Sequence, residues 1–543
     1  MRRIALWCSI IAVVLSASSC GGGGGDQFTL TVAIDGGTGT GAVTSSPPGI
    51  NCPGTCSAKF DRNVAVSLTA NADPSSVFSA WTGDVTSSAN PVVVKLDAPT
   101  TVHAAFAVRE FVLTLATTST AGAVGSVTSV STPSAPVEID CGSRCAVTLP
   151  YNTSVTLTAT PVAGSYFGGW TGDCSGGSSI CVLKMTAARS ISASFTPANI
   201  VFSSSVEYTL ATLASLGSGA NTTLKVLVGA DKVCQNAAQS AGLSNAASFV
   251  AWLSASSRPA PSHFPPTARG WVRTDGRPFA DSIAALTSTY QVFYPPVLDE
   301  KGGTVAGEER VWSATLANGQ AYQASAACQD YTSASPLDYA ATGERAAGAQ
   351  GWTNQNTHGE ITCDRPARLY CFGTEYSAVV PPPPPPPSFR YVFLTANSFD
   401  PSTSITGADA KCAAQKGSLP GTYKALLATS VAAAASRFTV RNVPVIRPDN
   451  VIVADSDAAF LAGTLPLRAP IDVEAGVVYS MGYVFTGASS PAANGTATCN
   501  DWTDRTASFQ GRTGFYSLTL SQWFDLADFG CDFASGRIYC LQE

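Results

Sequence analysis

"FSAWTGDVTSSANPVVVKL" at residues 78–96 recurs as "FGGWTGDCSGGSSICVLKM" at residues 167–185, displaced by 89 residues. Around both copies, apolar and small polar residues alternate with a period of two, and Gly and Pro clusters separate the alternating runs. That period places successive side chains on opposite faces of a strand, as in a half-buried sheet. The repeat therefore predicts two small all-β modules, at residues 28–108 and 109–198.

A Cys-x3-Cys loop recurs at the same displacement, in "GINCPGTCSAKF" and "EIDCGSRCAVTL". The second copy carries two further cysteines, Cys174 and Cys181, where the first copy has Val85 and Val92. Two apolar residues can replace a buried disulfide but not half of a four-ligand metal site. Cys174 and Cys181 are therefore predicted to form a structural disulfide rather than a metal or redox site. The other module cysteines are left to bridge within their own copies, Cys52 with Cys56 and Cys141 with Cys145.

Both modules resemble the divergent bacterial B-repeats of internalin type. The shared marks are a glycine-rich start, the Cys-x3-Cys loop, the "WTGD" turn and a closing phenylalanine, Phe106 or Phe195. Such modules usually serve as stalks or spacers in surface proteins. The resemblance therefore implies that these two modules hold another part of the chain away from a surface.

The chain opens with "MRRIALWCSIIAVVLSASSC", a charged start, a short apolar run and small residues, which predicts an export signal at residues 1–19. It resembles a bacterial lipoprotein signal, in which Cys20 would become the lipidated first residue, although Ala17 stands where the family usually has Leu. A plain secretory signal is the alternative. Residues 20–27 would then be the lipid anchor and a glycine tether. The resemblance implies a protein that is lipid-anchored to the bacterial outer membrane or cell surface.

Composition narrows the compartment and the partners. The 543 residues are too many for one domain, and 31 basic against 37 acidic side chains give a net charge of −6. No basic cluster is present, so nucleic acid is excluded as a partner. Sixteen cysteines, less Cys8 in the signal and Cys20, leave an even number for an oxidising compartment. Seven disulfides are therefore expected.

A second pair of repeats fills the rest of the chain, separated by "PPPPPPP" in a stiff linker at residues 377–388. The cysteine spacings are 94, 35 and 8 before the linker and 87, 32 and 9 after it. "GADKVC", "CQDYTS" and "ARLYC" match "GADAKC", "CNDWTD" and "GRIYC". Two copies of one α+β domain are predicted, at residues 199–376 and 389–543. Asp231 and Asp409 of the GAD triplets are expected to cap the start of a helix.

This cysteine pattern resembles the C-type lectin and endostatin fold, in which the first cysteine pairs with the fourth and the second with the third. The pairs that it implies are Cys234–Cys371, Cys328–Cys363, Cys412–Cys540 and Cys499–Cys531. More closely, "GADAKC…GTYKALLA…CNDWTD…GRIYC" is similar to the leptospiral endostatin-like outer-membrane lipoproteins, strongly across residues 389–543 and more weakly across 201–376. The resemblance implies a surface lipoprotein that binds host or matrix macromolecules.

Catalytic and metal-binding motifs are scarce. The three histidines, His103, His263 and His358, are isolated in the sequence, and the hypothesis that His358 and Glu360 form an acid and base pair is weaker than that of a polar surface loop. The chain is therefore predicted not to be an enzyme and to need no cofactor. Calcium is left open, because carboxylates are its usual ligands. The candidate carboxylates are Asp501, Asp504, Asp525, Asp528 and Asp532.

Aromatic residues gather between the inner cysteines of the last domain. Core packing is predicted for Trp502 and Trp523, while Phe515, Tyr516 and Phe524 are the candidate ligand surface. The leading hypothesis is a non-enzymatic, adhesin-like surface lipoprotein that binds an extracellular protein through its C-terminal domains. The alternative is a carbohydrate-binding protein that uses the same aromatic loops. The sequence names neither the partner nor the oligomeric state.

Overall fold

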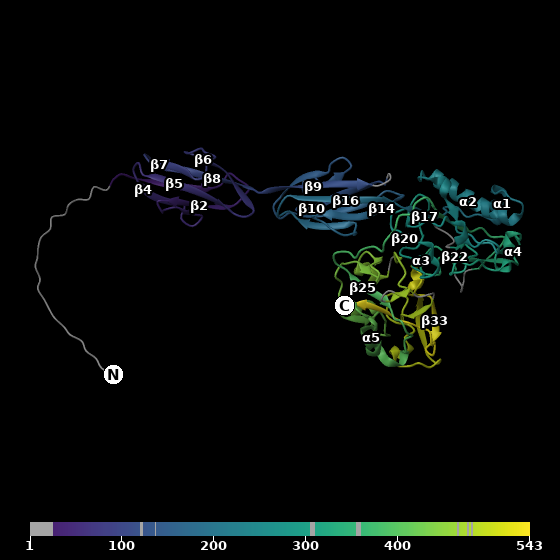
Figure 1. Cartoon of the computed structure of the whole chain (residues 1–543). Coiled ribbons are helices and arrows are strands. Elements are labelled where there is room, and N and C mark those ends of the chain that lie inside the picture. The colour runs from purple at the N-terminus through teal and green to yellow at the C-terminus, as the bar shows by residue number, and fades with distance from the viewer. Residues whose placement is uncertain are drawn as a thin grey trace, which may run out of the picture. The chain divides into compact units, whose positions relative to one another are not determined.

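The computed structural model shows the chain as β-rich modules followed by mixed α and β segments (Figure 1). The residues that it describes are 25–119, 123–135, 137–304, 310–354, 360–463, 466–474, 477–478 and 482–543. Within these ranges, no helix is long and apolar enough to cross a membrane. The predicted signal and Cys20 lie outside the described residues.

The first module is a sandwich of two four-stranded sheets, ordered β4-β1-β8-β6 and β3-β2-β5-β7. Its strands are β1 (Gln27–Ile34), β2 (Gly41–Ser46), β3 (Asn51–Cys52), β4 (Ser57–Asp61), β5 (Ala65–Ala72), β6 (Ser76–Gly83), β7 (Val92–Lys95) and β8 (Thr100–Val108). Alternate residues of both sheets form one core around the fully buried Trp81. The Trp81 indole N–H donates to Ala89 O at 3.0 Å, which satisfies its only polar atom.

The second module repeats this architecture, with sheets ordered β12-β9-β16-β14 and β11-β10-β13-β15. Its strands are β9 (Glu110–Ser119), β10 (Gly125–Thr132), β11 (Asp140–Cys141), β12 (Ala146–Pro150), β13 (Ser154–Pro161), β14 (Ser165–Gly172), β15 (Ile180–Lys184) and β16 (Arg189–Pro197). Trp170 donates to Ser178 O at 2.7 Å, the bond that Trp81 makes 89 residues earlier. The sequence repeat is therefore a repeat of fold, as predicted.

Residues 199–376, here called the third segment, are built around two neighbouring inner strands of one sheet, β17 and β24. The elements are β17 (Asn199–Ser203), α1 (Leu210–Leu216), α2 (Thr222–Ser240), η1 (Ala246–Ser248), β18 (Val250–Ala251), η2 (Ala260–His263), β19 (Trp271–Arg273), β20 (Pro278–Ala280), α3 (Ile283–Thr287), β21 (Arg310–Trp312), η3 (Ala324–Ala326), α4 (Cys328–Tyr331), β22 (Tyr339–Glu344), β23 (Glu360–Thr362) and β24 (Arg368–Phe372). The sheet order is β20-β19-β17-β24-β21-β22-β23. Val201 and Phe202 point to opposite faces and enter two separate cores, one of them covered by α1 and α2 (Figure 1).

Residues 389–543, the fourth segment, repeat this plan with smaller sheets, ordered β26-β34-β25-β27-β28, β29-β30 and β31-β32-β33 in the described part. The elements are β25 (Arg390–Leu394), η4 (Pro401–Thr403), α5 (Ser404–Gln415), β26 (Tyr423–Ala425), β27 (Val445–Ile446), η5 (Ala434–Arg437), β28 (Ile452–Ala454), α6 (Asp457–Ala462), β29 (Val473–Glu474), β30 (Val477–Val478), β31 (Tyr483–Phe485), α7 (Cys499–Trp502), β32 (Gln510–Phe515), η6 (Ser521–Trp523), β33 (Ala527–Gly530) and β34 (Tyr539–Gln542). Val392 and Phe393 again enter different cores.

Seven disulfides join the cysteine pairs that the sequence analysis proposed. Three lie in the modules and four in the third and fourth segments: Cys52–Cys56, Cys141–Cys145, Cys174–Cys181, Cys234–Cys371, Cys328–Cys363, Cys412–Cys540 and Cys499–Cys531. In each of the last two segments, the outer disulfide ties the long helix, α2 or α5, to the closing strand, β24 or β34. The helix is thereby fixed to the middle of its sheet.

The expected helix starts at the GAD triplets are wrong. Helix α2 begins at Thr222, where the side chain of Asn221 accepts from Leu224 N at 2.8 Å. Asp231 therefore lies inside the helix, and its carboxylate accepts from Ala251 N at 2.8 Å; Asp409 does the same with Ala425 N at 2.9 Å. Both carboxylates connect a helix to a neighbouring strand instead of capping the helix.

The second module continues into the third segment almost without a break, since only Ala198 separates β16 from β17. The Asn199 amide donates to Arg269 O and Tyr376 O, each at 2.7 Å. The linker is also less free than its composition predicts. Val380 is buried, and its N–H donates to Asp281 Oδ1 at 2.8 Å. The first residues of the linker therefore pack against the third segment and do not act as a spacer.

Candidate functional site

Two short turns, α4 and α7, have an unusual backbone. In α7, the φ angles of Cys499, Asn500, Asp501 and Trp502 lie between 49° and 63°, and α4 has the same left-handed conformation at its four matching residues. For L-residues this conformation costs roughly 1–2 kcal/mol each. Such strain persists only where the surroundings impose it, and it is concentrated at functional sites.

Three interactions hold the α7 turn. Cys499 is tied by its disulfide to Cys531, the residue that follows β33. The Asp501 carboxylate accepts from Ser430 N at 2.6 Å and from Ser430 Oγ at 2.7 Å, and the hydrogen bond from the Ser430 backbone is the main cause that lowers the pKa of Asp501. The Trp502 indole N–H donates to Ala428 O at 2.7 Å. The turn is therefore anchored at three of its four residues to parts of the chain far away in sequence.

The α4 turn of the third segment is held in the same way. Asp330 accepts from Ser256 N at 2.8 Å and from the Ser256 hydroxyl, and the Tyr331 hydroxyl donates to Ser254 O. Tyrosine thus replaces tryptophan with the same hydrogen-bond geometry. The matching motifs "CQDYT" and "CNDWT" therefore encode one structural device, used twice.

A groove of about 560 Å³ opens beside the α7 turn. It is lined by Ser430, Thr496, Ala497, Thr498, Asn500, Asp501, Ala507, Ser508, Phe509, Gln510 and Asp528. Most of these side chains carry hydroxyl, amide or carboxylate groups. Two apolar side chains are exposed here. Phe509 belongs to the lining and is 40% exposed, and Val431, which follows Ser430 of the lining in the chain, is 82% exposed. The groove offers hydrogen bonds and apolar contact to a bound molecule, and its floor rests on the fixed turn.

The third segment is apolar on its surface at the matching place. Leu337, which is 90% exposed, and Tyr339 stand where the fourth segment has Ser508 and Gln510, 171 residues later. Sequence reasoning missed Leu337, Phe509 and Val431. Each lies in a short irregular stretch, so no periodic pattern distinguishes it from a core residue.

The predicted ligand surface is wrong at Phe515, Tyr516 and Phe524, which are at most 4% exposed. Tyr516 and Phe524 belong to the core of the fourth segment, and Phe515 packs with Ala347 of the third segment. Short strands provide little apolar area, so the aromatic residues of the loops complete the core. Trp502 and Trp523 are buried, as predicted.

Four of the five carboxylates considered for calcium bind protein groups. Asp501 holds Ser430, Asp504 accepts from Thr506 N at 2.7 Å, and Asp525 and Asp528 both pair with Arg512. Among the described residues, no three His, Cys, Asp or Glu side chains gather as metal ligands would. The described residues therefore give no support to a calcium site at these carboxylates.

The histidines occupy ordinary polar contacts. His263 Nε2 lies 2.8 Å from Asp231 Oδ2, and His103 Nδ1 lies 2.7 Å from Asp35 Oδ1. In both cases the carboxylate belongs to a different part of the same domain, so the pair joins two chain segments. His358 lies outside the described residues.

The third and fourth segments meet at a contact, here called the seam, that joins equivalent residues of the repeat. Gly348 N donates to Ser517 O at 3.0 Å, and Thr519 N donates to Ala346 O at 3.2 Å. Ala346 matches Ser517, and Gly348 matches Thr519, at a displacement of 171 residues. The two bonds are therefore reciprocal, as in the two-fold interface of a homodimer.

A buried charge cluster completes the seam. Arg447, in β27's following turn, pairs with Asp449 and Asp472, each at 2.7 Å, and donates to Val292 O of the third segment at 3.1 Å. Asp472 is fully buried, and its Oδ2 has no hydrogen-bond partner in the part of the chain that the structure describes. Burial raises the pKa of Asp472 to about 7, against the opposite effect of Arg447.

Comparison with known families assigns the two N-terminal modules. Residues 30–110 and 115–199 match the family model of the divergent InlB B-repeat domain. The chain therefore carries two domains of this kind, as their shared sheet order indicates. A comparison with curated protein sequences finds no significant match.

Solved structures that resemble the chain come from bacterial proteins. The Bacillus anthracis TIE protein is 10% identical over 33% of this chain and 35% of its own, with a TM-score of 0.21. The major pilin T-13 of Streptococcus pyogenes is 11% identical over 32% of this chain and 97% of its own, with a TM-score of 0.18. Two B-repeat units of the Staphylococcus aureus collagen-binding protein are 11% identical over 33% and 51%, with a TM-score of 0.13. The chain thus spans about a third of the length of the TIE protein.

Proposed function

We propose that the chain is a non-enzymatic, adhesin-like binding protein of the bacterial surface. A lipid on Cys20 anchors it, residues 21–27 form a tether, and the two B-repeat domains form a stalk. Two endostatin-like domains, at 199–376 and 389–543, form the head that binds an extracellular protein. The two matched B-repeat domains and the export signal expected before them support this arrangement.

The groove beside the α7 turn is the observation that carries the binding role. Its lining combines the exposed ring of Phe509 with hydrogen-bonding groups, and the exposed Val431 follows Ser430 of the lining in the chain; apolar and polar groups together are typical of protein interfaces. A disulfide and the Asp501 contacts hold the supporting backbone in place. The backbone therefore loses little conformational entropy when a partner binds. Exposed apolar side chains on a fixed base are what a binding surface requires.

Binding of the mature full-length chain to immobilised extracellular matrix proteins tests this role. Replacing Val431 and Phe509 together by Ser should weaken binding at least tenfold, on the order of the loss seen at interface hot spots. Val206→Ser, at an exposed position of the third segment, is the matched control and should bind normally. Binding that is unchanged in the double variant would exclude the groove.

Carbohydrate binding is the second candidate, because the same groove presents an aromatic ring and two side-chain amides. Phe509 offers a face for sugar C–H groups, and Asn500 and Gln510 offer donors and acceptors for hydroxyl groups. Binding of the full-length chain to a glycan array but not to matrix proteins, lost on Phe509→Ser, would favour this candidate over the first.

The anchor has its own test, since lipidation needs the Cys20 sulfur. Cys20→Ala should release the protein from the membrane fraction into the medium or the soluble fraction. A variant that stays with the membranes after a high-salt wash would refute lipid anchoring while leaving the binding role intact.

A further inference from the structure

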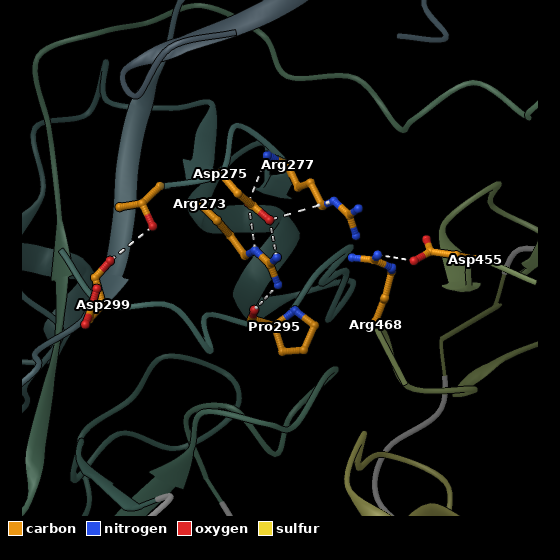
Figure 2. A network of polar contacts seen from close by, with 8 residues as sticks. Arg273, Asp275, Arg277, Pro295, Asp299, Asp455 and Arg468 are labelled. Carbon is orange, nitrogen blue, oxygen red and sulfur yellow. Dashed lines mark hydrogen bonds and ion pairs between the residues drawn. The ribbon is translucent and has the colours of Figure 1, made fainter. Parts of the chain in front are cut away.

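Two arginines from different segments face one another at the seam. Arg277 follows a tight turn of the third segment, and Arg468 precedes a proline turn of the fourth segment. Figure 2 shows their guanidinium groups pointing toward each other. After burial, the charge of Arg468 is the largest influence that lowers the pKa of Arg277, as expected for two neighbouring cations.

Arg277 is held in place but not fully paired. Its guanidinium lies over the Tyr294 ring, 5.3 Å from the ring centre, and the Tyr294 hydroxyl in turn accepts from Ile452 N at 3.0 Å. The nearest carboxylate, Asp275, is 3.7 Å from Arg277 Nε and is bound at 2.5 Å by Arg273. Arg277 Nη1 is buried and has no hydrogen-bond partner among the described residues. An unpartnered buried N–H of a charged group is costly.

Arg468 is positioned from the opposite side. Its guanidinium pairs with Asp455, and its backbone N–H donates to Val453 O at 2.8 Å. The side chains of Arg277 and Arg468 are 29% and 38% exposed, so a solute can reach both. Neither arginine has an arginine at its matching position in the repeat, where Val451 and Phe293 stand. The pair is therefore an addition to the repeated design.

The local charge is unbalanced. Three guanidinium groups, of Arg273, Arg277 and Arg468, share two carboxylates, Asp275 and Asp455. The nearby Arg447 has two carboxylates, Asp449 and Asp472, but both are bound to Arg447 inside the seam, and neither forms an ion pair with Arg277 or Arg468. Like charges that face each other at a partly buried site repel unless an anion lies between them.

We propose that Arg277 and Arg468 together bind one oxyanion, so that a single sulfate, phosphate or carboxylate group bridges the third and fourth segments. Guanidinium forks match the oxygen spacing of such groups and bind them in bidentate fashion. The exposed part of the Arg277 guanidinium, which shares Asp275 with Arg273, would gain an acceptor, and the repulsion between the arginines would become attraction through the anion. The source is either a free inorganic ion or a carboxylate side chain of an extracellular protein.

Thermal unfolding of the mature full-length chain with added sodium sulfate tests the site, at an ionic strength kept constant with sodium chloride. Saturable binding should raise the melting temperature of the head by roughly 2–4 °C at ten times the dissociation constant. Arg277→Gln with Arg468→Gln should abolish the rise. Arg505→Gln, which removes an exposed arginine paired with Asp400, is the matched control and should keep it.

A second readout needs no added ligand. At low salt without sulfate, Arg468→Gln alone should unfold at the same or a higher temperature than the unmodified chain, because the repulsion between Arg468 and Arg277 is removed.

A glutamate tripeptide in place of sulfate distinguishes the two sources of the anion. Protection at a lower concentration than sulfate indicates a carboxylate ligand, and protection by sulfate alone indicates a free ion. No saturable rise with either anion, or a rise that persists in the double variant, would overturn the proposal.

Discussion

Asp472→Asn should stabilise the head at neutral and alkaline pH. The carboxylate of Asp472 is fully buried at the seam, accepts from Arg447 Nη1 at 2.7 Å and shares this arginine with Asp449. One guanidinium therefore faces two carboxylates, and one negative charge is left over when both are ionised. Burial raises the pKa of Asp472 to about 7, and the charge of Asp449 adds to this rise.

The sign and size of the effect follow from this pKa. Between the ordinary value of 3.8 and about 7, the folded chain holds a proton that the unfolded chain has released. The free energy of unfolding therefore falls as the pH rises through this window, and the loss is complete above it. At roughly 1.4 kcal/mol per pH unit, the upper limit is about 4 kcal/mol. Because the Arg447 pair and local relaxation reduce it, we expect a gain on the order of 1–3 kcal/mol for Asp472→Asn at pH 8.

Urea denaturation followed by tryptophan fluorescence at pH 5, 6, 7 and 8 measures this gain. The variant should lose less stability than the unmodified chain as the pH rises. Asp504→Asn is the control: hydrogen bonds from Thr506 lower the pKa of Asp504, so this exposed carboxylate is ionised throughout the range in both states. If Asp472→Asn is less stable at pH 8 and keeps the original pH slope, the buried charge is not a burden and the reasoning fails.

Three further predictions concern the disulfides, the strained turn and the seam. Replacing Cys174 and Cys181 together by Val should leave the second module folded, with a melting temperature lower by a few degrees, and either single replacement should be worse because a free thiol mispairs; circular dichroism during heating checks this. Asp501→Ala should destabilise the head by roughly 1–3 kcal/mol in urea titrations, because two hydrogen bonds to Ser430 are lost; an unchanged midpoint would show that the left-handed turn needs no such support. Cleavage at a protease site placed in the linker should leave the third and fourth segments together in size-exclusion chromatography, and two separate peaks would contradict the seam.

The sequence predicted the modules because their signals are local and repeated. Period-two alternation and the displacement of 89 residues define the strands, and the structure gives both modules the same sheet order. The repeat also identified the Cys174–Cys181 disulfide. The first module has Val85 and Val92 at the matching positions, and an apolar pair can replace a structural disulfide there.

The candidate site and the seam depend on contacts that no local pattern records. Asp231 looks like a helix cap in sequence, yet Asn221 starts the helix and Asp231 binds a strand 20 residues away. Phe515 looks like surface in a loop, yet it is covered by Ala347. Arg277 and Arg468 acquire their meaning only when two segments pack, since they are 191 residues apart.

The outer disulfides limit how far the chain can be stretched. If a bound partner pulls on the head against an anchored N-terminus, tension enters the third segment at β17 and passes on through β24. Cys234 and Cys371, 137 residues apart, are covalently joined, so the chain between them cannot extend when force is applied to its ends. Cys412 and Cys540 protect the fourth segment in the same way over 128 residues. A force that unfolds these sheets would therefore lengthen the two segments by only a small fraction of their contour length. The head could refold once the force is released.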